Sequence, residues 1–256
     1  MPEPSADAES LLPSAIDALI ARTGDLTPIK SDVRSQVWHL EAKPDADEPA
    51  LRRDWALKRC GVPRWKAWAP PGWRLTPGHR QAFGARRLAG SSLRFAGPAA
   101  VVQRGAAEYT VVPWVEGVTL DAWWPDALPE DRLRMVGSLG RLLGMLTAHR
   151  LRNRDFKPTN LLVDAEAEVG GLPVMIDLDG VDRGGWDRDA VRSAAVLERA
   201  LRRIDRVEPG EADAFDRACG EAAPKLFDSQ ADRIAAFREA IDAAHDARPL
   251  SYDPAP

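Results

Sequence analysis

The chain has 256 residues, of which 45% are hydrophobic and 29% charged, and its formal net charge is −4. That apolar content is enough for one large domain or two small lobes and argues against global disorder. The acidic balance argues against a nucleic-acid-binding protein. The two cysteines, Cys60 and Cys219, form no CxxC pair. Their isolation argues against a structural zinc site and a disulfide framework.

Residues 1–24 are predicted to form an N-terminal helical extension, with a polar start and apolar residues at helical spacing over residues 9–23. The segment carries acidic residues and lacks the basic start and apolar core of a signal peptide. No apolar run approaches the roughly 20 residues that a membrane-spanning helix needs. We therefore expect a cytoplasmic protein with at most peripheral contact with the inner membrane surface.

Residues 25–115 are predicted to form a mostly β lobe with one main helix. Thr76 is a favourable N-cap and Pro77 a favourable first helical residue, so a helix is expected from there to about residue 88. β-Branched and aromatic residues near alternate positions predict strands at 33–40, 54–60, 99–103 and 109–114.

Residues 116–248 are predicted to form a mostly helical lobe, followed by a tail over residues 249–256. A helix over 130–149 is indicated by an apolar stripe at three- and four-residue steps, formed by Leu133, Val136, Leu139, Leu143 and Leu146. Short apolar runs at 161–163 and 174–176 predict a hairpin. Further helices are expected at 188–204, 210–222 and 229–246. The predicted fold is therefore α+β, with two lobes joined near residues 114–117.

The segment RNRDFKPTNLLVD, residues 152–164, places several polar groups before an apolar run. Transfer of a phosphoryl group to a hydroxyl needs a carboxylate to take the proton, a cation near the γ-phosphate and oxygen ligands for Mg²⁺. Asp155 is the candidate for the proton-accepting carboxylate. Lys157 is the candidate for the cation near the γ-phosphate, and Asn160 is a candidate oxygen ligand for Mg²⁺. Asp177, at the end of the next apolar run, is the candidate for the main metal ligand. An ordinary polar turn before an acidic strand end is the alternative interpretation.

The RDFKPTN motif, together with the IDLDG segment at 176–180, resembles the catalytic loop and metal-binding segment of the protein-kinase-like superfamily. The resemblance implies a bilobal fold that uses ATP and Mg²⁺. It also implies that Lys58, in the WALK segment, holds the α- and β-phosphates, although a surface lysine at a strand edge is the alternative. The segment YTVVPWVEGVTL resembles the hinge of that fold, with the backbone between Pro113 and Val115 facing adenine.

Three features are similar to the bacterial lipopolysaccharide kinases, which phosphorylate Kdo or heptose of the inner core from the cytoplasmic side. They are the short helical lobe, the KSDVRSQVW turn in place of a glycine-rich loop, and the RDAVRS start of the helix after IDLDG. The resemblance covers about residues 28–204. It implies a glycolipid or sugar acceptor, while a serine/threonine kinase or a small-molecule kinase stays an alternative.

The sequence departs from the kinase pattern at three places. Asn153 stands where the pattern has histidine, at a position that supports the loop and does not react. The helix TPGHRQAFGARRL has no acidic residue to pair with the strand lysine, so Gln81 is the expected occupant of that position.

The third departure is the absence of glycine from the nucleotide-binding turn. Close backbone approach to phosphate is therefore restricted. Contact through the side chains of Ser31, Arg34 or Ser35 is the functional interpretation, and a plain turn is the other. Together these departures make a pseudokinase, a nucleotide-binding scaffold of the same fold, the alternative to an active enzyme.

Overall fold

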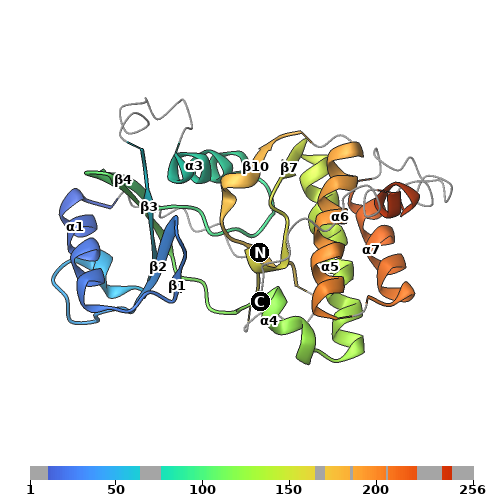
Figure 1. The fold of residues 1–256 in the computed structure, drawn as a ribbon, viewed down its shortest axis with the longest axis horizontal. Helices are drawn as coiled ribbons and strands as arrows, with labels where there is room; N and C mark the ends of the chain where they lie inside the picture. The colour runs from blue at the N-terminus through green and yellow to red at the C-terminus, as the bar shows by residue number, and fades with distance from the viewer. Residues whose placement is uncertain are drawn as a thin grey trace. The chain divides into compact units, whose positions relative to one another are not determined.

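The computed structural model describes residues 11–63, 76–164, 171–184, 187–205, 207–223 and 238–243. The fold is α+β with an antiparallel main sheet (Figure 1). The chain divides into two compact units. The first contains residues 1–86 and 96–115, and the second contains residues 87–95 and 116–256.

A five-stranded antiparallel sheet forms the centre of the first unit, with the strand order β1–β2–β3–β5–β4. The four predicted strands are confirmed, each within about two residues at its ends. The short β1 was not predicted, because two exposed residues carry no periodic signal. The strands are β1 (Lys30–Ser31), β2 (Ser35–Leu40), β3 (Trp55–Gly61), β4 (Ala100–Arg104) and β5 (Ala107–Pro113).

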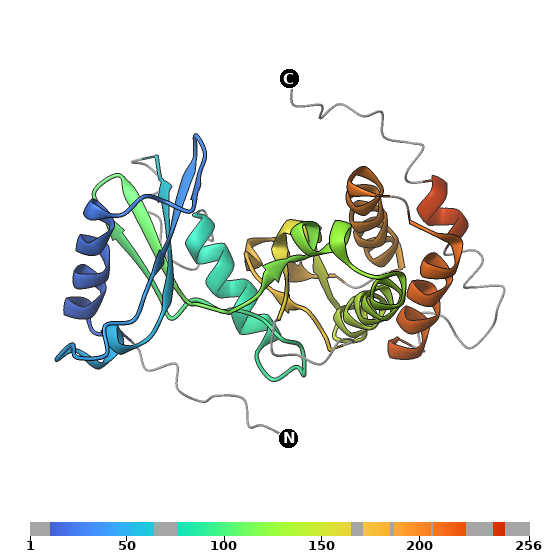
Figure 2. The same ribbon diagram turned by 90° about the horizontal axis from the view of Figure 1, so that it is seen from below.

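Helix α1 (Pro13–Arg22) covers one face of this sheet (Figure 2). The helix begins at Pro13, because proline suits the first helical turn, where no backbone donor is needed. Its Ile16 and Leu19 pack against inward-facing residues of β2, β3 and β5, among them Trp38 and Leu57. Residues 13–22 therefore belong to the core of the first unit.

Helix α3 (Pro77–Leu88) begins as predicted, with Thr76 as its N-cap. The Thr76 side chain is 1% exposed, and its Oγ1 accepts a hydrogen bond from the His79 backbone N–H at 3.4 Å. A Cβ atom on Gly78 would lie 2.6 Å from Thr110 Oγ1 and 2.8 Å from Glu108 Oε1. Glycine at this position therefore allows the start of α3 to approach β5 on the face of the sheet opposite α1.

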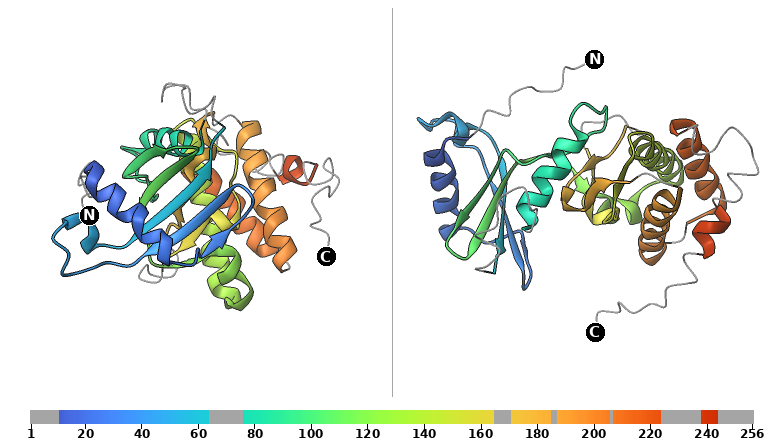
Figure 3. Two further views of the ribbon diagram at one scale, coloured as in Figure 1. Left: turned by 60° about the vertical axis from the view of Figure 1, so that its left-hand side comes forward. Right: turned by 90° about the horizontal axis from the view of Figure 1, so that it is seen from above.

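Helices α5, α6 and α7 form the bulk of the second unit, where α5 and α7 lie side by side (Figure 3). Gly140 and Gly144 of α5 face the backbone of α7, where a Cβ atom would collide with the carbonyl oxygens of Phe215 and Cys219. The helix predicted over 130–149 is confirmed; Leu133, at the start of its apolar stripe, is 46% exposed, whereas the other four stripe residues are buried. The helices are α4 (Leu120–Trp123), α5 (Pro129–Ala148), α6 (Asp187–Ile204) and α7 (Pro209–Ala222).

Two small sheets complete the second unit. The predicted hairpin is confirmed, because β8 (Leu161–Val163) pairs antiparallel with β9 (Val174–Met175), and β6 (Val118–Thr119) joins on the other side. The second sheet pairs β7 (Leu151–Asn153) with β10 (Val181–Arg183). This pairing was not predicted, because both strands are short and the partners lie far apart in the sequence.

Several predicted segments lie wholly or partly outside the described residues. Of the helix expected over 229–246, residues 238–243 are helical and the rest lies outside. The predicted tail, residues 249–256, also lies outside. Within the described part of the chain, no helix has both the length and the apolar character needed to cross a membrane.

Candidate functional site

The candidate site is the loop that follows β7. Asn160 donates two hydrogen bonds through Nδ2, to Asp155 Oδ2 at 2.9 Å and to the Asp155 carbonyl oxygen at 3.1 Å. Lys157 Nζ lies 2.9 Å from the same Oδ2. The structure therefore brings together three of the residues that the sequence singled out.

Burial separates the supporting groups of this loop from those that reach solvent. Phe156 is fully buried and Asn160 is 6% exposed, whereas the Asp155 and Lys157 side chains are 39% and 42% exposed. Asp155 Oδ1 has no hydrogen-bond partner among the described residues. One oxygen of this carboxylate is thus held in place, and the other is available to a ligand.

Asp177 lies two residues after the end of β9, and a backbone hydrogen bond of its neighbour joins this segment to the loop. The Ile176 N–H donates to the Asn160 carbonyl oxygen at 2.9 Å, so Asp177 comes one residue after this contact. Asp177 also has a left-handed backbone, with φ 54° and ψ 66°. Non-glycine residues rarely adopt this conformation, aspartate more readily than most, and residues held in it are enriched at functional sites.

Asn160 and Asp177 provide ligand types that suit Mg²⁺. This ion takes oxygen ligands and is usually held by one or two carboxylates plus substrate phosphates and water. The Asn160 amide nitrogen is engaged by Asp155, which leaves its oxygen for a cation. Within the described ranges there is no group of three or more His, Cys, Asp and Glu residues that could hold a metal. The Asn160 amide oxygen and the Asp177 carboxylate are the donor types that a Mg²⁺ site with few protein ligands would use.

Gly180 brings the IDLDG segment back against the candidate loop. Its carbonyl oxygen accepts a hydrogen bond from the Arg154 N–H at 3.0 Å, and the next residue, Val181, pairs with Asn153. A Cβ atom on Gly180 would lie 2.7 Å from Asn153 Oδ1 and 3.0 Å from the Asp155 backbone nitrogen. Only glycine therefore allows this close contact.

The buried Asn153 side chain supports the backbone of this loop. It is 2% exposed, and its Oδ1 accepts a hydrogen bond from the Asp155 N–H at 3.0 Å. Its carbonyl oxygen accepts one from Ser193 Oγ at 3.2 Å. Asparagine in place of histidine thus provides a direct side-chain support for the backbone of Asp155.

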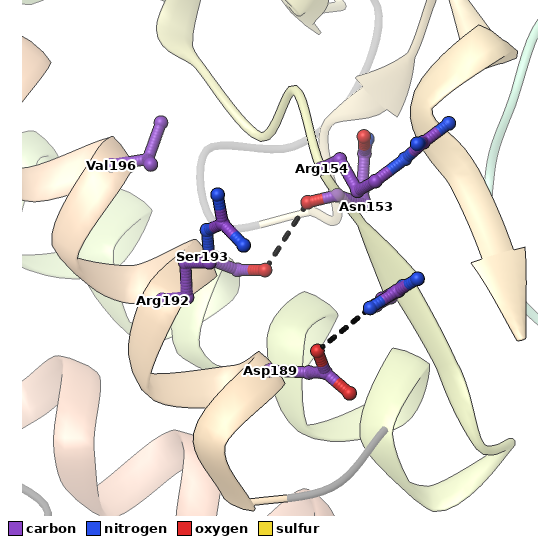
Figure 4. A pocket seen from close by; sticks show the side chains of 7 residues that line it. Asn153, Arg154, Asp189, Arg192, Ser193 and Val196 are labelled. Atoms are coloured by element: carbon purple, nitrogen blue, oxygen red, sulfur yellow. Dashed lines mark hydrogen bonds and ion pairs between the residues drawn. The ribbon is translucent and has the colours of Figure 1, made fainter. Parts of the chain in front are cut away.

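A small pocket lies between this loop and α6 (Figure 4). Asp189 forms an ion pair with Arg152 at 3.1 Å, and the bond from Ser193 to Asn153 is drawn beside it. Sequence reasoning missed both contacts of α6, although the RDAVRS motif that contains Asp189 and Ser193 was noticed. The pocket is lined by Arg152, Asn153, Arg154, Asp189, Arg192, Ser193 and Val196.

Lys58 lies in the first unit, on the sheet face that α3 approaches. The strand pairing places it opposite Val37 of β2 and Thr110 of β5. Ala56, two residues earlier, shares its face, because side chains two apart on a strand point the same way. Val37 and Ala56 are partly exposed, so this part of the face presents apolar surface beside the lysine.

Gln81 is 4% exposed on α3, one turn after Gly78. Its side-chain amide forms no hydrogen bond with any described residue, Lys58 included. The structure therefore does not join these two predicted residues through a polar contact.

The turn from Ser31 to Ser35 is organised by Asp32. The Asp32 carboxylate accepts hydrogen bonds from the backbone N–H groups of Arg34 and Ser35, both at 2.7 Å, and from Ser35 Oγ at 2.9 Å. The Arg34 N–H contributes most to lowering the pKa of Asp32, followed by the two Ser35 donors. Two backbone donors and the Ser35 hydroxyl are thus engaged within the turn, which leaves the Ser31 and Arg34 side chains as the predicted contacts to phosphate.

The predicted hinge is fixed to β3 at its start. Pro113 pairs with Trp55, and the Trp114 N–H donates to the Asp54 carbonyl oxygen at 3.1 Å. The Trp114 ring stacks on His39 with 3.8 Å between centroids, and His39 Nε2 lies 2.8 Å from Asp54 Oδ2. Neither contact of His39 can be read from the sequence, because both depend on strand pairing. Val115, the last predicted hinge contact, is partly exposed.

No family model matches the chain, and no curated protein matches it in sequence. The functional assignment therefore rests on the residues themselves.

Proposed function

We propose that the protein is a kinase of the protein-kinase-like type, a bilobal enzyme that transfers the γ-phosphate of ATP to a hydroxyl group. The observation that carries the proposal is the arrangement of the Asp155 carboxylate. One of its oxygens is held by both Asn160 and Lys157, at 2.9 Å each, and the other is available. An ordinary polar turn does not require two side chains to hold one oxygen of an exposed carboxylate.

Asp155 is assigned to the acceptor hydroxyl. Its available Oδ1 would accept a hydrogen bond from that hydroxyl and take the proton as the new phosphate ester bond forms. Lys157 already lies within ion-pair distance of this carboxylate. Its ammonium group is therefore placed to balance the charge that develops on the transferred phosphoryl group.

Asp177 and Asn160 are assigned to Mg²⁺, through a carboxylate oxygen and an amide oxygen. When bound, this ion neutralises charge on the β- and γ-phosphates. The hydrogen bond from Ile176 to Asn160 keeps Asp177 and Asn160 close to the adjoining ends of β9 and β8.

The nucleotide is assigned to the face of the main sheet that carries Lys58. The lysine provides charge for the α- and β-phosphates, and the neighbouring Val37 and Ala56 provide apolar surface for the base. The backbone from Pro113 to Val115 provides the polar groups that an adenine edge requires, because backbone N–H and C=O groups are fixed donors and acceptors.

An inner-core sugar of lipopolysaccharide is the acceptor that we propose first. Gly180 and the start of α6 are separated by only a few residues. So short a segment offers no long loop for recognising a protein substrate. A pseudokinase is the second candidate, and the observation that favours it is the engagement of the Arg34 and Ser35 backbone donors by Asp32.

The test is a phosphate-transfer assay with purified protein, Mg-ATP labelled at the γ-phosphate, and three acceptors: Kdo-lipid A, a generic protein and water. We expect labelled Kdo-lipid A from the wild type. Asp155→Asn should lower the rate by about 10²- to 10⁴-fold, the usual contribution of a positioned general base. Nucleotide binding, measured by calorimetry, should persist in this variant.

Asp131→Asn is the matched control, since Asp131 lies on α5 and pairs with Arg134 on the same helix. Its rate should equal that of the wild type. Nucleotide binding without transfer to any acceptor would support the pseudokinase. Absence of binding with and without Mg²⁺ would overturn both candidates.

A further inference from the structure

We propose that the pocket between the candidate loop and α6 binds an oxyanion, a phosphate or carboxylate group, through Arg154 and Arg192. This ligand is additional to the nucleotide and the metal assigned above, and the inference does not depend on the kinase function. Three of the seven residues that line the pocket are arginines and one is an aspartate, so its lining carries a formal charge of +2 (Figure 4). A hollow with this excess of positive charge favours an anionic ligand over a neutral one.

The aspartate of the pocket is already engaged. Asp189 Oδ1 lies 3.1 Å from Arg152 Nη1, and the Asp189 side chain is only 8% exposed. The second oxygen, Oδ2, lies beside Gly184, where a Cβ atom would be 3.0 Å away from it. Asp189 and Arg152 therefore balance each other, and the positive charge that remains belongs to Arg154 and Arg192.

The side chains of Arg154 and Arg192 form no hydrogen bond or ion pair with any described residue. Both residues are exposed, and they border the pocket from two elements, the loop after β7 and helix α6. Two guanidinium groups that share one hollow repel each other unless an anion lies between them. An oxyanion would therefore supply the counter-charge that the described part of the chain does not provide.

The backbone that carries the two arginines is fixed. The Arg154 N–H donates to the Gly180 carbonyl oxygen at 3.0 Å. Ser193, next to Arg192, is 5% exposed and donates through Oγ to the Asn153 carbonyl oxygen at 3.2 Å. This bond joins α6 to the residue directly before Arg154. The fold therefore sets the separation of the two arginine backbones before any ligand binds.

Guanidinium chemistry specifies the class of ligand. Each group presents a planar fork of N–H donors that matches two oxygens of a phosphate or a carboxylate. Two sources of such a group fit the position of the pocket, a charged group on the acceptor and a free phosphate ion. Arg154 immediately precedes Asp155, with about 3.8 Å between their Cα atoms. A bound oxyanion would therefore lie beside the loop that carries the proposed base.

The test is a calorimetric titration of inorganic phosphate into the full chain, without nucleotide or Mg²⁺ and at constant ionic strength. We expect saturable binding by the wild type. Arg154→Gln and Arg192→Gln should each weaken this binding by about tenfold or more, the effect of losing a charge-assisted hydrogen bond. The circular dichroism spectrum should be unchanged, because both side chains are exposed.

Two control variants separate the pocket from other positive charge. Arg203→Gln removes an exposed arginine from the last turn of α6, outside the pocket lining, and should bind phosphate as the wild type does. Lys58→Met removes the lysine assigned to the nucleotide and should also leave the affinity for phosphate unchanged. No saturable binding, equal affinities in Arg192→Gln and Arg203→Gln, or loss of binding in Lys58→Met would overturn the proposal.

A second titration identifies the source of the oxyanion. Kdo-lipid A carries both carboxylate and phosphate groups, and its binding is measured with and without saturating phosphate. Competition would assign the pocket to the charged group of the acceptor. Independent binding, or no binding of Kdo-lipid A, would assign it to a free phosphate ion, and each of these results retains the oxyanion site. Because no phosphate is transferred in either titration, failure of the transfer assay would overturn only the kinase function.

Discussion

The Asn160 side chain is hydrogen-bonded to both ends of Asp155, its carboxylate at 2.9 Å and its backbone carbonyl at 3.1 Å. Five residues separate the two in the sequence, and the turn at Pro158–Asn160 brings them together. A candidate metal ligand thus orients a candidate general base directly. Changes that shift the backbone of this loop should therefore affect metal binding and proton transfer together.

Gly180→Ala should inactivate the protein without unfolding it. The new methyl group would lie 3.0 Å from the Asp155 backbone nitrogen, which cannot move aside as a flexible side chain can. We expect the rate of phosphate transfer to fall by about 10²-fold, as catalytic groups displaced by about 1 Å typically do. The measurement is the initial rate with Mg-ATP, together with the circular dichroism spectrum.

Gly137→Ala is the matched control for this change. Nothing lies within 4 Å of a Cβ at this position of α5. Alanine inside a helix should raise the free energy of unfolding by about 0.5–1 kcal/mol and leave the rate unchanged. Equal rates for Gly180→Ala and Gly137→Ala would show that the contact at Gly180 is unimportant.

Asn153→Ala should destabilise the second unit, because it removes the acceptor of the Asp155 N–H. An unpaired buried donor costs about 1–3 kcal/mol in the free energy of unfolding. Asn153→His should not restore the loss, although histidine is the residue of the kinase pattern. The space beside the Asn153 amide is already bordered by Gly180, and overpacking costs about 1–3 kcal/mol. Urea denaturation of both variants provides the measurement. Wild-type stability in Asn153→His would contradict the prediction that histidine overpacks this site.

Arg238 holds two buried carboxylates in the second unit, and its loss should be costly. Its Nη1 donates to Glu198 Oε1 at 2.6 Å, and its Nε and Nη2 donate to the two oxygens of Asp216 at 2.7 and 2.6 Å. The side chains of Asp216 and Glu198 are only 3% and 5% exposed. Arg238→Met should lower the free energy of unfolding at pH 7 by about 3–5 kcal/mol, the usual cost of breaking a buried pair.

The effect of Arg238→Met should depend on pH. Burial raises the pKa of Asp216 even with Arg238 in place, although the arginine opposes the shift. A carboxyl group with a raised folded-state pKa contributes stability that is fully present below its unfolded-state pKa and is lost as pH rises through the folded-state pKa. Without Arg238, the stability that Asp216 loses as pH rises should be larger. The difference in stability between variant and wild type should therefore shrink between pH 7 and pH 5, as measured by urea denaturation, and a constant difference would contradict this explanation.

The sequence by itself determined the longer strands and helices and which residues carry the candidate chemistry. Periodic apolar spacing identified β2, β3 and α5, because burial of one face requires that spacing wherever the element packs. The RDFKPTN motif identified Asp155, Lys157 and Asn160, because these residues are so close in sequence that a single turn brings them together.

The tertiary structure decided the relationships between residues that are distant in sequence. The pairing of β10 with β7 and the support of Asn153 by Ser193 both depend on strand register or helix packing. Neither is encoded in local periodicity, because a strand carries the same alternation whichever partner it pairs with. For this reason the sequence located the candidate loop, whereas only the fold shows which residues of α6 contact it.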